Sequence, residues 1–125
     1  MRDFRKLEIW SAGIEFSVNI YEVTEHFPAK EKYGLVSQMT RAAVSIPSNI
    51  AEGCKGSDKE LSRGLEIALG SAFELETQLI ISEKVGYLPQ EKFAQLIESL
   101  GLLQRRINAF RNTLKWSRMV GEMAY

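Results

Sequence analysis

Cysteine and histidine are almost missing from this 125-residue sequence. Cys54 is the single cysteine, so no disulfide can form within the chain, which favours a reducing, cytoplasmic location over secretion. His26 is the single histidine, and Val23 stands where a Glu-x-x-His di-iron motif would place its glutamate. Because so few ligands remain for zinc or iron, we expect no metal site and no cofactor.

The sequence also lacks a long hydrophobic run and an excess of either charge. Its longest aliphatic stretch, 79–81, is far shorter than the roughly 20 residues that cross a bilayer, and the N-terminus is charged where a signal peptide is apolar. Lys plus Arg and Asp plus Glu both number 16. We therefore expect a soluble protein with no membrane attachment, which could attract nucleic acid only through local clusters of charge.

Glycine and proline gather at 26–29, 53–56 and 86–89, and they divide the chain into four segments. In each segment apolar residues recur at steps of three and four, which is typical of amphipathic helices, and no segment sustains the alternation of a strand. Helices of similar length with short connections pack as antiparallel neighbours. The sequence predicts one all-α domain over 1–125, an antiparallel up-down-up-down four-helix bundle. The apolar positions are Leu7, Trp10, Ile14, Val18 and Tyr21; Leu35, Met39, Ala42, Ala43, Ile46 and Ile50; Leu61, Leu65, Ala68, Ala72, Leu75, Leu79 and Ser82; and Phe93, Leu96, Leu100, Leu103, Ile107, Phe110 and Leu114.

Helix signals mark the ends of these segments, and three residues conflict with them. Residues 57–60 read SDKE, a capping box in which Ser57 accepts from the Glu60 amide. Pro47 lies inside the second predicted helix and should kink it. Gly64 and Gly70 lie inside the third, where we interpret both as sites of close helix–helix approach.

Several segments have a recognisable order. Residues 38–53 read QMTRAAVSIPSNIAEG, 68–77 read ALGSAFELET and 85–88 read VGYL, after FRKLEIW at 4–10 and FPAKEKYG at 27–34. Over roughly residues 4–90 the chain resembles the bacterial four-helix proteins encoded within intervening sequences of large-subunit rRNA. The resemblance implies a homopentamer around a central channel. A similar protein serves diversity-generating retroelements by binding the reverse transcriptase and nucleic acid; that relative is strongly basic, whereas this chain is neutral.

A polar stripe follows the second predicted helix and faces the third. We expect it to form an interhelical ladder of salt bridges and hydrogen bonds, because buried charge persists only when it is paired. Arg41 would lie opposite Ser71 and Glu74, and replacing a buried Arg41 or Glu52 by alanine would cost about 3–5 kcal/mol. A ligand site or a subunit contact is the alternative. The stripe consists of Arg41, Ser45, Ser48, Asn49 and Glu52, with Arg63 and Glu74 as partners.

Basic residues concentrate near the C-terminus. Residues 101–125 carry five basic groups and one acidic group, whereas residues 1–100 carry 11 and 15. One interpretation is neutralisation by Glu8, Glu15 and Glu22 on the first helix. The other is a phosphate-binding patch, with Phe110 or Trp116 available to stack on bases and with copies multiplied in an oligomer. The basic run consists of Arg105, Arg106, Arg111, Lys115 and Arg118.

No arrangement of residues indicates an enzyme. A Cys-His or Ser-His-Asp arrangement would have to use His26, which lies in a different predicted connection from Cys54. Neighbouring carboxylates such as Glu74 and Glu76 point in different directions on a helix. We expect no catalytic residue and no small-molecule substrate. The aromatic residues Trp10, Tyr21, Tyr33 and Tyr87 are interpreted as core or interface anchors.

Two functions remain open. The first is a non-catalytic homo-oligomeric bundle, a pentamer by resemblance, that acts as a scaffold for RNA or for a nucleic-acid-handling protein. The second is a protein–protein interaction or assembly module that makes no contact with nucleic acid. An exposed basic patch favours the first, and Arg–Glu pairing between the first and fourth helices favours the second.

Overall fold

The computed structural model describes residues 1–114, which form four α-helices and two short 3-10 turns. The α-helices are α1 (Glu8–Thr24), α2 (Leu35–Gly53), α3 (Asp58–Lys84) and α4 (Gln90–Thr113), and the 3-10 turns are η1 (Phe4–Lys6) and η2 (Ala29–Glu31). No strand occurs among these residues, so the all-α prediction is confirmed for this part of the chain.

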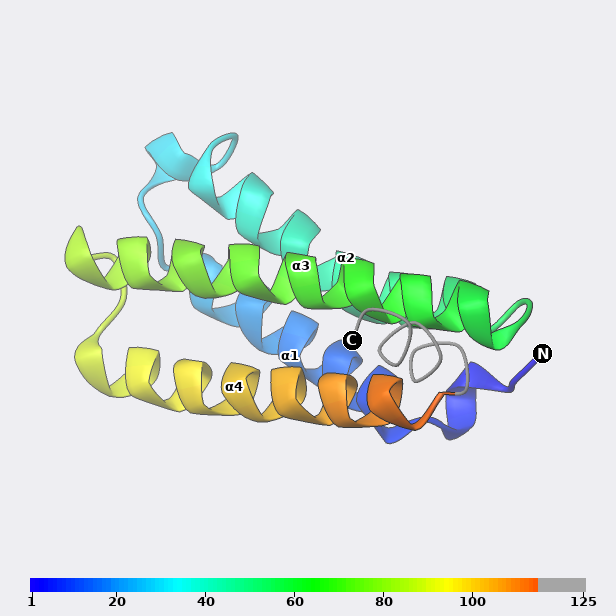
Figure 1. Ribbon diagram of the computed structural model, residues 1–125. Helices are drawn as coiled ribbons and strands as arrows, with labels where there is room; N and C mark the ends of the chain where they lie inside the picture. The colour runs from blue at the N-terminus through cyan, green and yellow to red at the C-terminus, as the bar shows by residue number, and fades with distance from the viewer. Residues whose placement is uncertain (115–125) are drawn as a thin grey trace.

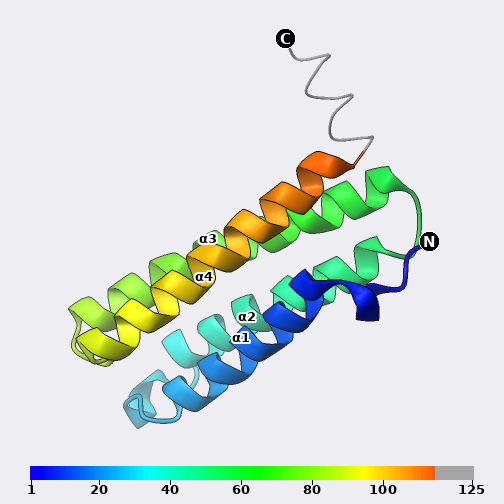
Figure 2. The same cartoon turned by 90° about the horizontal axis from the view of Figure 1, so that it is seen from below.

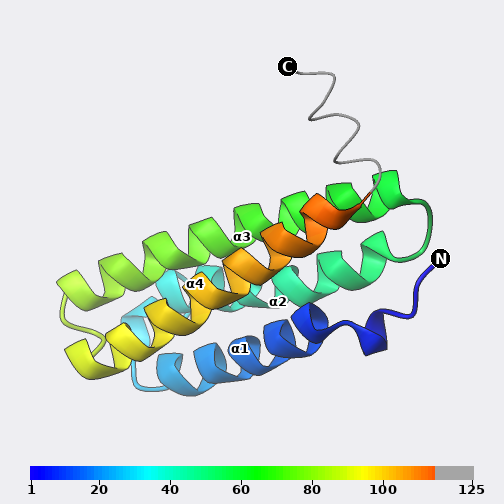
Figure 3. The ribbon, with the colours of Figure 1, turned by 60° about the horizontal axis from the view of Figure 1, so that its bottom comes forward.

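The helices are arranged as a bundle in which each one packs against two others. α1 contacts α2 and α4, and α3 contacts the same two helices. Figures 1 and 2 show α1 beside α2 in one layer and α3 beside α4 in the other. The α2–α3 connection, the start of the chain and the end of α4 lie together at one end of the bundle, here called the α2–α3 end (Figure 3). The other two connections lie at the opposite end.

The helix boundaries follow the capping residues that the sequence supplies. Ser57 accepts a hydrogen bond from the Glu60 amide at 3.4 Å at the start of α3. Gly86, with φ of 85°, follows the end of α3 in the left-handed conformation that favours glycine. Pro89 precedes the first residue of α4. The predicted breaks at 53–56 and 86–89 are therefore confirmed.

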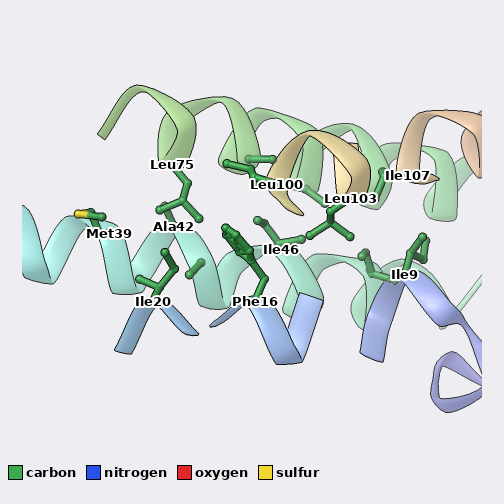
Figure 4. Close-up of a cluster of buried hydrophobic side chains, with 14 of the residues drawn as sticks. Ile9, Phe16, Ile20, Met39, Ala42, Ile46, Leu75, Leu100, Leu103 and Ile107 are labelled. Carbon is green, nitrogen blue, oxygen red and sulfur yellow. The ribbon is translucent and has the colours of Figure 1, made fainter. Parts of the chain in front are cut away.

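The core lies along the axis of the bundle (Figure 4). In α3 every predicted apolar position is buried, and in α2 and α4 nearly all are. The prediction is wrong for α1. Its core face consists of Ile9, Phe16, Ile20 and Val23, not of the residues that the spacing of apolar side chains had predicted. α1 carries two apolar stripes at helical spacing, and periodicity alone cannot say which of them faces the core.

The two glycines inside α3 have different environments. A Cβ on Gly64 would lie 2.5 Å from the Asn49 carbonyl oxygen and 3.1 Å from the Cα of Gly53, so close approach of α2 and α3 requires glycine there. Gly70 is exposed, and a Cβ on it would meet nothing within 4 Å. The predicted close approach is confirmed at Gly64 and wrong at Gly70.

At the end opposite the α2–α3 end, a hydrogen bond joins the two connections. Tyr87 Oη donates to Glu31 Oε2 at 2.8 Å, and the Leu35 amide donates to Glu31 Oε1 at 3.3 Å. The hydrogen bond from Tyr87 is the main reason that the pKa of Glu31 is lowered, and the same bond raises the pKa of Tyr87. Phe27 packs against the Tyr87 ring with the centroids 5.5 Å apart.

Candidate functional site: two interaction surfaces

The first surface is an apolar groove between α1 and α2. Ile14, Val18 and Tyr21 on α1 and Val44 on α2 remain between 41% and 53% exposed. They border a hollow of about 360 Å³, and no charged residue lines it. We call it the α1/α2 groove. Its lining consists of Trp10, Ile14, Ser17, Val18, Tyr21, Val44, Pro47, Ser48 and Ala51.

The floor of the groove is formed by a close contact between α1 and α2. A Cβ on Gly13 would lie 3.3 Å from both Cβ and Cδ of Pro47, so the absence of a side chain at Gly13 makes room for the proline ring. α2 continues through Pro47, which has no backbone N–H to offer the Ala43 carbonyl one turn earlier. Ser17 Oγ on α1 donates to that carbonyl at 2.9 Å, and it also lies 2.9 Å from the Gly13 carbonyl.

Except for Leu7, the residues that the apolar spacing of α1 had assigned to the core line this groove. A protein partner that covers this exposed apolar surface would remove it from water, which favours association. Of the aromatic residues interpreted as anchors, Trp10 and Tyr21 line the groove and Tyr87 is half-buried elsewhere. Tyr33 is 88% exposed, so it is not a core residue.

The second surface is the basic run on α4, of which the structure describes Arg105, Arg106 and Arg111. Arg111 is half-buried and pairs with Glu66 of α3 at 3.7 Å. Arg105 and Arg106 are exposed and make no ion pair with any residue of 1–114. Lys115 and Arg118, and with them Trp116, lie outside the described residues.

The fold adds a cation to this surface that the sequence had not suggested. Lys6 of η1 and Arg106 line the same hollow of about 310 Å³, whose other lining residues are Leu7, Glu8, Ile9, Ala109 and Phe110. We call it the α1/α4 hollow. Nearby, the Arg2 guanidinium lies 5.6 Å from the centroid of the Phe110 ring and pairs with Asp58 at 3.7 Å. No local sequence signal identifies Lys6, because it reaches Arg106 only through the packing of α1 against α4.

The predicted neutralisation of the basic run by α1 is not what the described residues show. Glu15 lines a second hollow that includes Arg106, of about 180 Å³, and Glu8 lines the α1/α4 hollow. Neither glutamate, nor Glu22, forms an ion pair with an α4 arginine within the portion of the chain described. The neutralising contact that does occur comes from Glu66 of α3.

The polar stripe of α2 is joined to α3 by a hydrogen bond between uncharged side chains rather than by buried charges. Ser45 Oγ and Ser71 Oγ lie 2.8 Å apart across the helix pair, and Asn49 Nδ2 donates to Ser45 Oγ at 2.9 Å. Arg41 and Glu52 are exposed, so the expectation that they are buried and paired is wrong. Because solvent surrounds both side chains, their removal leaves no buried charge behind.

The charged partners predicted for the stripe are also at the surface. Glu74 accepts from Gln78 Nε2 of its own helix at 3.2 Å, and Glu52 pairs with Lys55 at 3.7 Å. Arg63 lies with Asn49 and Glu52 around a shallow hollow of about 200 Å³ near the α2–α3 connection. Ser45, not Arg41, lies opposite Ser71, because the predicted register was about one turn away from the observed one.

The single cysteine and the single histidine lie in different connections of the fold. Cys54 is 2% exposed at the α2–α3 end, and burial raises the pKa of its thiol. His26 is exposed in the connection at the opposite end. Within residues 1–114 no three His, Cys, Asp or Glu residues are placed to hold a metal ion. None of the helices there has the length and apolar character needed to span a bilayer.

Comparison with known proteins decides the family. The family model described as 23S rRNA-intervening sequence protein matches residues 5–109, well over half of the chain. The chain belongs to this family. The part that matches the 23S rRNA-intervening sequence proteins includes Lys6, Arg105 and Arg106, and it ends before Arg111.

A solved structure has the same fold as this 23S rRNA-intervening sequence protein. It is a protein with unknown function from the S23 ribosomal protein family of Bacteroides thetaiotaomicron. The two share 21% sequence identity and a TM-score of 0.77, over 84% of this chain and 96% of that one. At this identity the likeness shows the fold alone. No curated protein matches the chain.

Proposed function

We propose that this protein is a non-catalytic bundle that associates with copies of itself through the α1/α2 groove and so forms a scaffold. The observation that carries the proposal is the groove itself, whose lining includes Ile14, Val18 and Tyr21 and no charged residue. The homopentamer that the family resemblance implies is part of the proposal, as is a reducing, cytoplasmic location, which suits the free thiol of Cys54.

A second copy of the chain is the occupant that best fits the groove. The groove is lined without any charged residue, and the other helices of the bundle also expose apolar residues, including Ile67, Phe73 and Ile81 of α3. Copies of this chain therefore carry both an apolar groove and exposed apolar side chains outside it, so each copy can supply what another leaves uncovered. A different protein is the alternative occupant.

The test of self-association is a charge placed in the groove. We expect Val18→Glu to convert the oligomer into a monomer, because a carboxylate in the covered part of an interface loses its hydration without gaining a partner. The control is Ala94→Glu, which places the same charge at an exposed position of α4, outside the groove and away from the exposed apolar residues of α3. The measurement is light scattering coupled to gel filtration over a range of protein concentrations.

Two results would contradict this proposal. A wild-type protein that stays monomeric at every concentration would show that a second copy does not occupy the groove. An oligomer that survives Val18→Glu, or that Ala94→Glu disrupts equally, would show that copies do not associate through the groove. Circular dichroism of each variant separates loss of association from loss of fold.

A second candidate function is association of the scaffold with RNA. It is favoured by Lys6, Arg105 and Arg106, exposed cations that pair with no acid in the described portion of the chain. In an oligomer each copy contributes the same cations, which makes binding avid and sensitive to salt. We expect labelled RNA to bind at low salt and to be released steeply as salt rises, measured by fluorescence anisotropy. Absence of binding by the intact oligomer at low salt would leave the protein–protein assembly module as the function.

A further inference from the structure

The α1/α4 hollow combines an apolar floor with cations at its rim. Leu7 and Phe110 are half-buried and Ile9 is buried, and these residues form the floor beside the small Ala109. Lys6 and Arg106 are exposed, line the same hollow, and pair with no acid within residues 1–114. A hollow of about 310 Å³ is therefore flanked by one cation from η1 and one from α4.

One ligand chemistry matches this combination. A single-stranded nucleic acid carries flat, largely apolar bases that can leave water, each next to a charged phosphate. A duplex keeps its bases stacked inside and offers mainly phosphates and groove edges. We propose that the α1/α4 hollow receives one unpaired base of a single-stranded RNA, while Lys6 and Arg106 bind the adjoining phosphates. This proposal rests on the second candidate function and states which form of RNA the surface binds.

Neighbouring residues define the limits of the site. Arg2 lies over the Phe110 ring and pairs with Asp58, so Arg2 helps to form the wall and its charge is already compensated. Glu8 is the acidic residue among those that line the hollow, and its carboxylate repels phosphate. Arg105 is next to Arg106 in sequence but does not line the hollow, because successive helical residues point about 100° apart.

These positions give variants that separate base binding from general charge attraction. Ala109→Leu fills the hollow and leaves every charge in place, so we expect affinity for a single strand to fall roughly 5- to 150-fold, the range for losing one stacked base. Arg106→Ala and Lys6→Ala should each also lower the slope of log affinity against log salt by about 0.7, as expected for one lost phosphate contact on a single strand. Arg105→Ala is the matched control and should have a smaller effect. Glu8→Gln should strengthen binding.

The experiment titrates full-length protein into labelled oligouridylate, oligoadenylate and the duplex of the two, by fluorescence anisotropy at several salt concentrations. Wild-type protein that binds none of them overturns the RNA association and this inference together. Wild-type protein that binds, with Ala109→Leu unchanged and with Arg105→Ala equal to Arg106→Ala, overturns only the hollow and leaves a diffuse basic surface. If the duplex binds as tightly as the single strands, the proposal that the hollow receives an unpaired base is overturned as well.

Discussion

At the contact between α1 and α2, Ser17 of α1 donates a hydrogen bond to a backbone carbonyl of α2 that lacks its usual donor. Pro47 deprives the Ala43 carbonyl of its usual donor, and Ser17 Oγ lies 2.9 Å from that carbonyl. Ser17 is 7% exposed, so water has little access to replace it. The proline is thus tolerated in α2 because α1 supplies the missing hydrogen bond, in agreement with the rule that buried carbonyls are satisfied.

The dependence of Pro47 on Ser17 can be measured with a double-mutant cycle. In the wild-type background we expect Ser17→Ala to lower the free energy of unfolding by about 1–3 kcal/mol, because it leaves a buried carbonyl without a donor. In a Pro47→Ala background the alanine N–H can bond to Ala43, so the same Ser17→Ala change should cost much less. Urea denaturation at a fixed protein concentration gives the four free energies.

A second serine serves as the control for this cycle. Ser11 Oγ also donates to a backbone carbonyl, that of Glu8 at 3.2 Å, but it is exposed and its acceptor belongs to α1 rather than to α2. Ser11→Ala should change stability little in either background. If Ser17→Ala had the same effect with and without Pro47, the serine would act through packing or through the Gly13 carbonyl rather than through the proline.

Between elements, the backbones of α2 and α3 approach each other closely near the connection that joins them. Gly53 and Gly64 allow the two backbones to meet, with a Cβ on Gly64 only 2.5 Å from a carbonyl oxygen of α2. Gly70, two turns further along α3, has open space around it and contributes only backbone freedom to the unfolded chain. The same residue type therefore serves the packing of α3 at one position and weakens the helix at the other.

Alanine substitutions separate these roles. Gly64→Ala should lower the free energy of unfolding by about 1–3 kcal/mol or more, because the added methyl group meets backbone atoms that cannot move aside. Gly70→Ala should raise it by about 0.5–1 kcal/mol, since alanine favours the helix and restricts the unfolded chain. Thermal and urea denaturation of both variants would show this difference in sign. Equal effects of the two substitutions would mean that α2 and α3 are not held at this distance by Gly64.

The features of the helices that local sequence determines could be predicted, whereas those that depend on packing between helices could not. The breaks at Gly53, Gly86 and Pro89 depend on backbone conformation, which local sequence determines, and they were predicted correctly. The apolar positions of α3 form one stripe and were also predicted correctly. The core face of α1 was predicted wrongly because Val18 and Ile20 are equally apolar, and only the position of α2 shows which of them faces inward.

At the scale of the molecule, the fold places Lys6 and Arg106 at the same hollow, although they lie far apart in the sequence. The basic character of α4 could be predicted from Arg105, Arg106 and Arg111. The participation of Lys6 could not, since almost the whole chain lies between it and Arg106 in sequence. The register of the α2–α3 pair was also beyond local signals, and so Arg41 was placed opposite Ser71, where the structure has Ser45.

The two proposed surfaces use different parts of α1, and this separation matters for assembly. The α1/α2 groove is lined by residues from Trp10 to Tyr21 of α1, whereas the α1/α4 hollow involves the end of η1, the first residues of α1 and the end of α4. A second copy that covers only the groove residues leaves Lys6 and Arg106 accessible, because neither lines the groove. An assembly of copies would present the hollow once per subunit, so a flexible single strand could occupy several hollows in succession.

The two-sided apolar character of α1 gives the proposed self-association a dependence on protein concentration. A subunit that is too dilute to meet another copy keeps Ile14, Val18 and Tyr21 in contact with water. In that state its exposed apolar surface is available for unspecific association with other proteins, although its own core is complete. Under the proposed self-association, the share of subunits in this state rises as the protein is diluted.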